Sequence, residues 1–527
     1  MLGHGNRVGR AAEGDEIVTS PSDAGGVSAV RSPAVARVLI DGAEHKAPTA
    51  EVINPARVSE IVGDYALGAA RHVDLAVRAA AAAFPAWSAL PAAARGEHLL
   101  RAADEMAGHV PGWAETLTRE VGKVLPESRG DAAGAVSLTR YFASLAAEVD
   151  AERPVELPLA GRGVLRHVPS GPVGVISPWN TPIYLTFLAV APALIAGDTV
   201  VVKPPEDAPL AVTAALSVLA RALPPGVVNI VPGRGDEAGA ALAAHPGVRK
   251  ILFTGSVETG KRVLRAAADT VKNVGLELGG NDAALVLRDA AIGPDLIREL
   301  IAGVFGMSGQ VCYGVKRIYV DASRLAEFTG AFTEMAARIV VGDGLDPRST
   351  IGPVTTRAGY EKVLSLRAAS EIAGAQVHVV GTRLDPAGWE DGYFVRPTVV
   401  TGLAPDAPLV TAEQFGPVIP ILPFADEDEA VRLANDTEFG LGASVWSADI
   451  ERAWRLARRI QAGSVFVNVH RVGASPMSLP FGGFKQSGVG RNHGLESVLA
   501  CMEQQAVVEF DDPAALPGTD HWRAHLG

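Results

Sequence analysis

Residues 171–203 read GPVGVISPWNTPIYLTFLAVAPALIAGDTVVVK, and this stretch decides the fold. Two short runs rich in β-branched residues, VGVIS (173–177) and TVVVK (199–203), lie on either side of a longer apolar segment. Short β-branched runs are typical of buried strands, and an apolar segment of this length is typical of a helix. We therefore predict a strand, a turn, a buried helix and a second strand.

The uncharged run from Val168 to Gly197 is long enough to suggest a membrane span. However, Pro178, Asn180, Pro182 and Pro192 interrupt it, and its longest clean stretch, Leu185–Ala191, is far too short to cross a bilayer. No membrane association is predicted.

The alternation of strands and helices continues to Gly280. Further candidate strands are VVNIV (227–231), ILFTG (251–255) and VGLEL (274–278), and the segment 208–223 repeats apolar residues at helical spacing. This order predicts an α/β fold with a Rossmann-type, doubly wound parallel sheet. Ligands of such sheets bind beyond the C-terminal ends of the strands.

A second α/β region follows, with helices predicted at 322–339 and 427–434. Its candidate strands are RIYV (317–320), QVHVV (376–380), VIPIL (418–422), ASVWS (443–447) and SVFVNV (464–469). A hairpin at 153–168, around Gly161 and Gly163, and a late strand at 506–510 are expected to pair across subunits. A homodimer or homotetramer is therefore expected.

The charge and the cysteine content of the chain limit which partners and which cellular location are expected. The 59 acidic residues outnumber the 47 basic ones and no basic tract is present, so nucleic acid is not an expected partner. Two cysteines, Cys312 and Cys501, cannot build a disulfide framework, which predicts a reducing, cytoplasmic location. Residues 1–36, rich in Gly, Ser, Ala and charge, are predicted to form a flexible extension.

Cys312 follows an amphipathic helical segment that ends near Gly306 and Gly309. Such an ending places the thiol on a tight turn, where backbone N–H groups are free to point at a bound oxygen. Taken alone, a single cysteine is more often a small buried hydrophobic residue than a nucleophile. Both interpretations of Cys312 stay open at this point.

Two other polar residues come directly after predicted strands. Glu277, in VGLELGGN, is either an ordinary solvated carboxylate or a general base. Asn180, in SPWNTP, has two amide N–H donors that do not titrate, so it could hold a developing oxyanion. Asparagine beside proline is, however, more often a turn residue.

Three residues at strand ends favour a dinucleotide site: Lys203 and Glu206 in VVVKPPEDAPL, and Ser256 in FTGSVETGK. A cation, an acid and a Gly-rich turn into a helix suit a ribose and a pyrophosphate. The stretch GSVETGKR is most of a P-loop, but Arg262 stands where Ser or Thr must hold magnesium. No nucleophile elbow or zinc motif is present, and no metal site is predicted.

Seven short motifs occur in order along the chain. They are PWN (178–180), KPPE (203–206), FTGS (253–256), ELGG (277–280), GQVC (309–312), EQFGP (413–417) and PFGGFKQSG (480–488). This set closely resembles the hydrolytic, NAD(P)-dependent aldehyde dehydrogenase superfamily, and the resemblance runs from about Val38 to Phe510.

The resemblance implies a mechanism and a fold. Cys312 would attack the aldehyde as a thiolate, with the oxyanion held by Asn180 and the Cys312 N–H, and hydride would pass to the nicotinamide. Glu277 would then deprotonate the water that hydrolyses the thioester to a carboxylic acid. The implied domains are an NAD-binding domain (37–150 and 171–280), a catalytic domain (281–495), an oligomerisation element (151–170 and 496–512) and a C-terminal tail (513–527).

The resemblance also implies the cofactor contacts. Lys203 and Glu206 would hold the adenine ribose, Ser256 would approach the pyrophosphate, Glu413 would bind the nicotinamide ribose, Phe415 would lie near the ring, and Trp179 would shape the pocket beside them. A carboxylate accepts hydrogen bonds from a 2′-hydroxyl but repels a 2′-phosphate, so Glu206 favours NAD, with NADP as the alternative.

The substrate is less constrained, because Asn281 and Asn492 depart from the lysine and glutamate that are frequent in the family. The expected pocket residues are Thr181, Leu185, Leu188, Val311, Tyr313, His470 and Met477. This mostly apolar set favours a neutral aliphatic or aromatic aldehyde. Two alternatives stay open: a coenzyme A-acylating semialdehyde dehydrogenase, which Glu277 disfavours, and a non-catalytic binding protein of the same fold.

Overall fold

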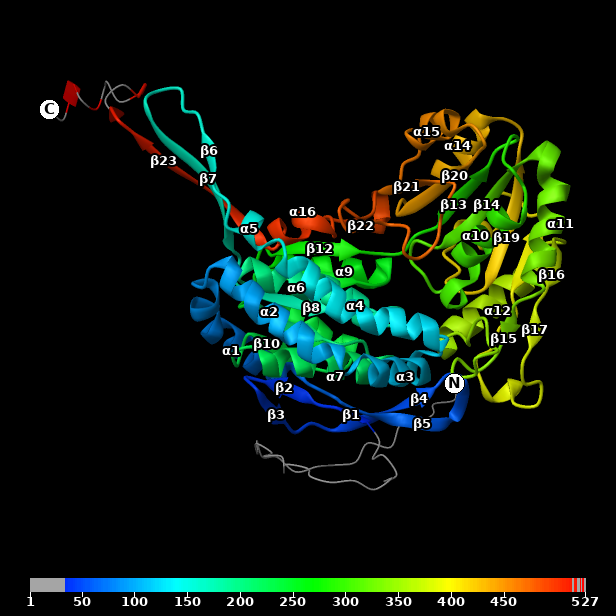
Figure 1. The fold of residues 1–527 in the computed structure, drawn as a ribbon, viewed down its shortest axis with the longest axis horizontal. Coiled ribbons are helices and arrows are strands. Elements are labelled where there is room, and N and C mark those ends of the chain that lie inside the picture. The colour runs from blue at the N-terminus through cyan, green and yellow to red at the C-terminus, as the bar shows by residue number, and fades with distance from the viewer. Residues whose placement is uncertain (1–33, 514–515, 519–521, 523, 526–527) are drawn as a thin grey trace.

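The computed structural model describes residues 34–513, 516–518, 522 and 524–525 (Figure 1). The predicted α/β fold is present, and its first sheet has eight strands in the order β22-β12-β11-β8-β9-β10-β2-β3. Five central strands run parallel: β12 (Asn273–Glu277), β11 (Lys250–Thr254), β8 (Pro172–Ile176), β9 (Thr199–Lys203) and β10 (Val228–Ile230). The antiparallel strands at the two edges are β22 (Gly488–Val489), β2 (Val38–Ile40) and β3 (Ala43–His45).

Helices cover both faces of this sheet, because its strands bury both sets of side chains. Val200 and Val202 of β9 pack on one helical layer and Val201 on the other, as the alternation along a strand requires. The first layer contains α2 (Ala92–Ala107), α3 (Val110–Val121), α4 (Leu125–Ala143), α5 (Ala146–Val149), α6 (Pro182–Ala196) and α7 (Pro209–Ala222). The second contains α1 (Ala70–Ser88), α8 (Ala240–Ala244) and α9 (Val257–Ala268).

Helix α6 is the apolar segment of the opening stretch. Proline at its first position and Gly197, with φ +101°, just after its end define its two boundaries. It is almost wholly buried, so its apolar composition reflects packing. Within the described part of the chain, no single helix is long and apolar enough to cross a membrane; α1 and α2 pass that test only as a pair bent by 120°.

The second sheet has seven strands in the order β16-β18-β19-β14-β13-β20-β21 and, apart from β16, is parallel. Its strands are β13 (Asp282–Val286), β14 (Val315–Asp321), β16 (Gln376–Val379), β18 (Thr398–Thr401), β19 (Val418–Phe424), β20 (Gly442–Trp446) and β21 (Ser464–Val467). The surrounding elements are α10 (Pro294–Phe305), α11 (Leu325–Ala336), α12 (Arg357–Ile372), α13 (Pro408–Thr411), α14 (Glu427–Asn435) and α15 (Ile450–Ala457), with β15 (Val340–Val341) and β17 (Thr382–Arg383) as a separate pair.

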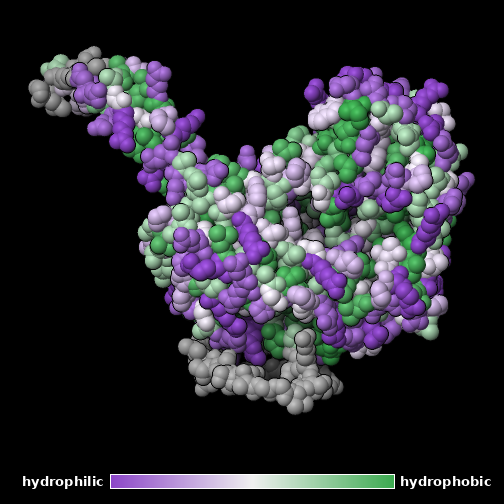
Figure 2. Space-filling view, in the orientation of Figure 1, coloured by the Kyte–Doolittle hydropathy of each residue, from purple (hydrophilic) through white to green (hydrophobic). Residues whose placement is uncertain are grey.

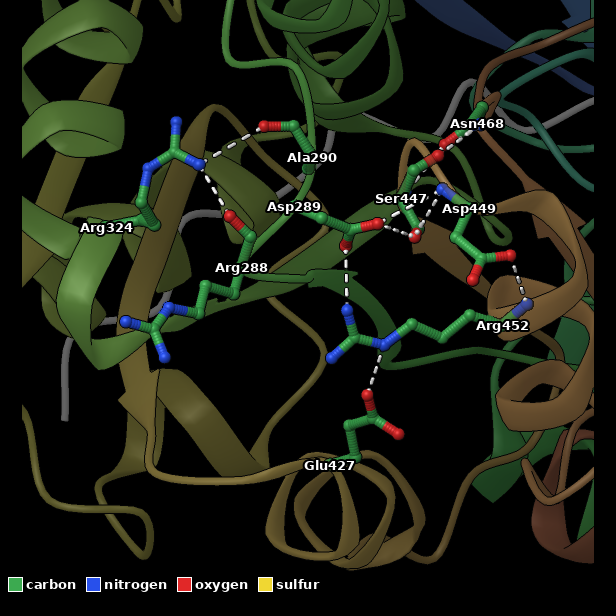
Figure 3. A network of polar contacts seen from close by, with 9 residues as sticks. All are labelled: Arg288, Asp289, Ala290, Arg324, Glu427, Ser447, Asp449, Arg452 and Asn468. Atoms are coloured by element: carbon green, nitrogen blue, oxygen red, sulfur yellow. Dashed lines mark hydrogen bonds and ion pairs between the residues drawn. The ribbon is translucent and has the colours of Figure 1, made fainter.

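A polar network ties the loop after β13 to the helices on one side of this sheet (Figure 3). Asp289 accepts hydrogen bonds from the Ser447 hydroxyl (2.7 Å) and the Asp449 N–H (3.1 Å), and it forms an ion pair with Arg452. Arg452 also binds Glu427 at the start of α14. The network links α14 and α15 to the loop after β13.

An antiparallel arm extends away from the body of the molecule (Figure 1). It consists of β6 (Arg153–Val155), β7 (Gly161–Pro169) and β23 (Met502–Phe510), and α16 (Gly494–Leu499) leads into it. The predicted hairpin and late strand are confirmed, although Gly161 and Gly163 lie within β7 and not in the turn. Val155, Val507 and Val508 are exposed on the arm, where Figure 2 shows hydrophobic surface.

The N-terminal boundary differs from the predicted extension over 1–36. Ala34–Ala36 form β1, which pairs in parallel with β5 (Arg57–Ala66) beside β4 (Thr49–Asn54). Gly63 permits this pairing, because a Cβ there would lie 2.2 Å from the Ala34 carbonyl oxygen. The remainder of that prediction, residues 1–33, lies outside the described residues.

Candidate active site

The turn before Cys312 departs from ordinary backbone geometry. Helix α10 ends at Phe305, and Met307, Ser308 and Gly309 then have φ values of +50°, +56° and +75°. Two successive non-glycine residues in the left-handed region persist only when the surroundings hold them. The Ser308 hydroxyl donates to the Gly352 carbonyl (2.9 Å), and a Cβ on Gly309 would lie 2.4 Å from the Gly416 carbonyl oxygen.

Cys312 lies in the wall between two cavities, of about 550 and 450 Å³. Asn180, after β8, and Glu277, the last residue of β12, line both cavities with it. The structure therefore brings together the three residues that the sequence singled out for chemistry. The described residues hold no cluster of His, Cys, Asp or Glu suited to a metal ion.

Asn180 is buried and its amide points towards the cysteine loop. The amide nitrogen donates one hydrogen bond to the Gln310 carbonyl (3.0 Å), two residues before Cys312. A primary amide has a second N–H, which remains for the cavities that Asn180 lines. This donor suits an oxygen atom that gains negative charge beside the thiol.

Burial raises the pKa of the Cys312 thiol to about 12. The Lys316 ammonium opposes this shift, whereas the carboxylates of Glu277, Glu413 and Asp282 add to it. The thiol is therefore the resting form at neutral pH, and forming the thiolate requires a base and added positive charge.

Glu277 is held at the edge of the first sheet, where its backbone pairs with Gly488 of β22. Its Oε2 is buried and has no hydrogen-bond partner among the described residues. Burial raises the pKa of Glu277 well above its usual value, and Arg491 opposes the shift. A carboxyl group with a raised pKa is a stronger base and is suited to taking a proton near neutral pH.

The larger cavity lies at the C-terminal ends of β9 and β11, as the doubly wound sheet predicts. Lys203 is buried at the end of β9, and burial lowers its pKa. Glu206 accepts a hydrogen bond from the Gly235 N–H (2.8 Å). Ser256 caps α9 by accepting from the Thr259 N–H (3.2 Å), so this helix directs its N-terminus at the cavity. The cavity thus offers a carboxylate, an ammonium group and the N-terminus of a helix.

The other end of this cavity is formed by the segment before β19. Glu413 accepts a hydrogen bond from the Gly280 N–H (3.1 Å), and Phe415, with φ +53°, packs edge-on against Trp179 at 5.5 Å between ring centroids. A Cβ on Gly279 would lie 2.4 Å from the Glu413 carboxylate. All six predicted cofactor residues therefore line one cavity, which also contains Cys312.

The smaller cavity contains most of the predicted substrate residues. Thr181, Leu185, Leu188, Val311 and Tyr313 line it. The sequence correctly placed these side chains on α6 and beside the thiol, because helical spacing and chain proximity determine where they lie.

Two expected pocket residues lie elsewhere. His470 is fully buried beside the second sheet, where its ring contacts the Ser444 hydroxyl (2.9 Å) and the Tyr313 carbonyl (3.0 Å). Met477 packs behind the cavity wall, with its sulfur 3.6 Å from the Tyr184 hydroxyl. Neither residue lines the smaller cavity, so their prediction as lining residues was wrong.

Two acidic residues of α4, Glu127 and Asp131, line the smaller cavity and were not among the residues predicted from the sequence. Glu127 accepts a hydrogen bond from the Met307 N–H (2.8 Å), and burial raises its pKa. Asp131 forms a buried ion pair with Lys123 and accepts from the Tyr184 N–H (2.6 Å). The sequence feature that could have indicated them is their spacing: two acidic residues one helical turn apart, close to a lysine.

Comparison with known proteins agrees with this geometry. The model of the aldehyde dehydrogenase family matches residues 43–507. The chain is 36% identical to aminoaldehyde dehydrogenase 2, peroxisomal, of Malus domestica, over 90% of this chain and 96% of that protein. It is also 36% identical to betaine aldehyde dehydrogenase, chloroplastic, of Beta vulgaris, over 84% and 89% of the two chains.

A solved structure of betaine aldehyde dehydrogenase from Staphylococcus aureus in complex with NAD⁺ superposes with a TM-score of 0.87. The two sequences are 32% identical, and the match covers 92% of this chain and 97% of that one. The similarity in sequence and fold extends along nearly the whole length of both chains. The chain belongs to the aldehyde dehydrogenase family.

Proposed function

We propose that this protein uses NAD to oxidise an aldehyde to the carboxylic acid through a thioester on Cys312. One observation carries the proposal: Cys312, Asn180 and Glu277 share the wall between a cavity with dinucleotide-binding groups and a second cavity of substrate size. Incubating enzyme and aldehyde with NAD, with and without coenzyme A, tests it. Acid formation without coenzyme A is expected, and a strict requirement for coenzyme A would contradict it.

The reaction begins at the thiol. Glu277 accepts the thiol proton, and the sulfur adds to the aldehyde carbon while the carbonyl oxygen becomes an oxyanion. The Asn180 amide and the Cys312 N–H donate hydrogen bonds to that oxygen. Bound NAD supplies the positively charged nicotinamide that accepts the hydride.

The second half of the reaction releases the acid. Loss of hydride leaves a thioester on Cys312. Glu277 releases the thiol proton to solvent and then deprotonates a water molecule that attacks the acyl carbon. The bond to sulfur breaks, the carboxylic acid leaves, and the thiol is restored. The buried, unpaired Oε2 of Glu277 has room for a proton but no competing donor among the described residues.

The residues present at the larger cavity fit NAD better than NADP. Glu206, Asp207 and Asp236 surround Lys203, and Arg234 is paired with Asp236, so the charge on this side is negative. A 2′-phosphate would add repulsion, whereas a 2′-hydroxyl would donate to Glu206.

Substituting Glu206→Gln is expected to reduce the preference for NAD over NADP by about tenfold, because one repelling charge of about 1.4 kcal/mol is removed. The measurement is kcat/KM for both cofactors at saturating aldehyde. Glu451→Gln, on the exposed face of α15 beside the second sheet, removes the same charge far from the cofactor cavity. It should leave the ratio of kcat/KM for the two cofactors unchanged. An unchanged ratio in Glu206→Gln would argue against this assignment.

For the substrate we propose an aldehyde with a protonated amino group at its far end. Glu127 and Asp131 line the smaller cavity. Lys123 is paired with Asp131, and Arg471, also in the lining, is paired with Glu299, so Glu127 is the carboxyl group left for a cation on the substrate. This differs from the neutral aldehyde expected from the sequence, because neither acid belonged to the predicted pocket. The names of the plant relatives describe aminoaldehydes as their substrates.

Glu127→Gln is expected to lower kcat/KM for an ω-aminoaldehyde about tenfold while changing that for the alkyl aldehyde of equal chain length less than about twofold. Glutamine keeps an oxygen that accepts from the Met307 N–H, so the turn is preserved. The exposed Glu115→Gln is the charge-matched control. Equal losses for both aldehydes would contradict a charge-based preference.

We further propose that the arm of β6, β7 and β23 is the oligomerisation element, since Val155, Val507 and Val508 expose apolar surface on strands with free edges. The free state of Cys312 and Cys501 supports a reducing compartment such as the cytoplasm. The named plant relatives are peroxisomal or chloroplastic proteins.

A further inference from the structure

Lys316, the second residue of β14, binds the loop that carries Cys312. Its side chain is buried, with a relative exposure of 3% for the residue. The ammonium donates to three carbonyl oxygens of the loop: those of Val311 (2.5 Å), Cys312 (3.1 Å) and Gly314 (3.2 Å). Three charged hydrogen bonds satisfy all three N–H donors of a lysine, so the buried charge is fully solvated by the loop.

The remaining carbonyl of this loop, that of Tyr313, contacts Nε2 of His470 (3.0 Å). Every carbonyl from Val311 to Gly314 is therefore held by one of two side chains. Gly280 completes the enclosure, because a Cβ there would lie 2.7 Å from the Cys312 carbonyl oxygen. The peptide groups on both sides of the nucleophile have a fixed orientation as a result.

This orientation determines where the Cys312 N–H points. The C=O and N–H of a trans peptide point in opposite directions, so a Val311 carbonyl turned towards Lys316 turns the Cys312 N–H away from it. Within residues 34–513, that N–H donates to no other protein group. It is thus available for the oxyanion that forms on the substrate.

Lys316 also carries the opposite charge to the other ionisable groups that act on Cys312. The charged groups that act on Cys312 come from four elements: Glu277 of β12, Asp282 of β13, Glu413 before β19 and Lys316 of β14. Three are carboxylates that oppose ionisation of the thiol, and Lys316 is the cation that favours it. The ammonium also lies 5.9 Å from the centre of the Phe415 ring in the cofactor cavity wall.

We propose that Lys316 is a positioning residue for the reaction: it orients the Cys312 N–H as an oxyanion donor and supplies the fixed positive charge that stabilises the thiolate. The proposal rests on the proposed role of Cys312 as nucleophile. A purely structural lysine would fill space and bind carbonyls without changing how readily the thiol ionises, and this difference can be measured.

The test uses full-length Lys316→Met, which keeps the length of the side chain but removes its charge, and Lys316→Arg, which keeps the charge but changes the hydrogen-bond geometry. Iodoacetamide alkylation of the Cys312 peptide is followed by mass spectrometry across pH in the absence of cofactor. Lys272→Met, at a half-buried lysine before β12 that lines neither cavity, is the charge-matched control. Peptide mapping separates Cys312 from the buried Cys501.

In Lys316→Met the rate of alkylation at a fixed, near-neutral pH is expected to fall about tenfold or more, and kcat to fall about 100-fold, with NAD affinity within about twofold of wild type. In Lys316→Arg the alkylation rate should stay near that of wild type while kcat falls. If Lys316→Met does not fold, Lys316→Gln provides the same comparison.

An alkylation rate in the neutral variant equal to that of wild type at the same pH would overturn the inference, and so would an unchanged kcat. The proposed function fails separately: it would be contradicted if Cys312→Ala retained aldehyde oxidation, whatever the alkylation profile of the Lys316 variants.

Discussion

Replacing Cys312 by serine is expected to reduce kcat for aldehyde oxidation by at least about 10³-fold, with NAD affinity within about twofold of wild type. The substitution changes one atom and leaves the left-handed turn at Met307 and Ser308 in place. A serine hydroxyl ionises far less readily than a thiol, and its site already opposes ionisation by burial and three carboxylates. The alkoxide needed for attack is therefore not formed at neutral pH.

The measurement combines steady-state NADH formation with a titration of NAD binding by tryptophan fluorescence, since Trp179 lies in the cofactor cavity. Cys501→Ser is the matched control, because this second thiol is buried in the core around α6 and α16. It should lower Tm by burying a hydroxyl but leave kcat within about threefold. Substantial activity in Cys312→Ser would place the covalent step on another residue.

The five central strands of the first sheet could be predicted because each lies in a short run of apolar residues rich in β-branched side chains, whereas the edge strands β2, β3 and β22 were not predicted. Strand β13, at the centre of the second sheet, was missed because DAALV begins with residues that have low strand propensity. Its position follows from pairing with β14 on one side and β20 on the other. Tertiary pairing, not local preference, places this strand.

The same reason explains which site residues were found. Cys312, Glu277 and Asn180 each lie at the end of a predictable element, so their convergence follows from sheet topology. Glu127 and Lys316 act through contacts with backbone atoms, one of them 180 positions away in the chain, and a backbone acceptor or donor leaves no pattern in the sequence. The position of His470 was predicted wrongly because the sequence does not show whether a histidine ring faces a cavity or the core.

Replacing Glu277 by glutamine is expected to separate the two halves of the reaction. The first turnover should release about one equivalent of NADH per active site, because the thiol can lose its proton to solvent at high pH. Steady-state turnover should then fall about 10²- to 10⁴-fold, the range that loss of a general base produces. Rapid-mixing measurement of NADH absorbance gives the size of the burst. The mass of the Cys312 peptide should show the retained acyl group.

The pH dependence adds an independent check on this carboxyl group. Burial raises the pKa of Glu277 above its value in the unfolded chain, so the folded protein favours the protonated form. Its contribution to stability is complete below the unfolded pKa and is lost as pH rises through the folded value. Turnover should rise over the same interval, because the base must be ionised to activate water.

Glutamine at position 277 cannot ionise and therefore should not lose that stability. The Tm of Glu277→Gln is expected to match wild type at acidic pH, where the wild-type carboxyl is protonated, and to exceed it at alkaline pH. Glu451→Gln, an exposed carboxylate on α15, should show no such divergence. A Tm difference between Glu277→Gln and wild type that is constant across pH would mean that the variant gains stability from packing. A Tm difference that grows over the pH range in which kcat rises would link catalysis and instability to one buried charge.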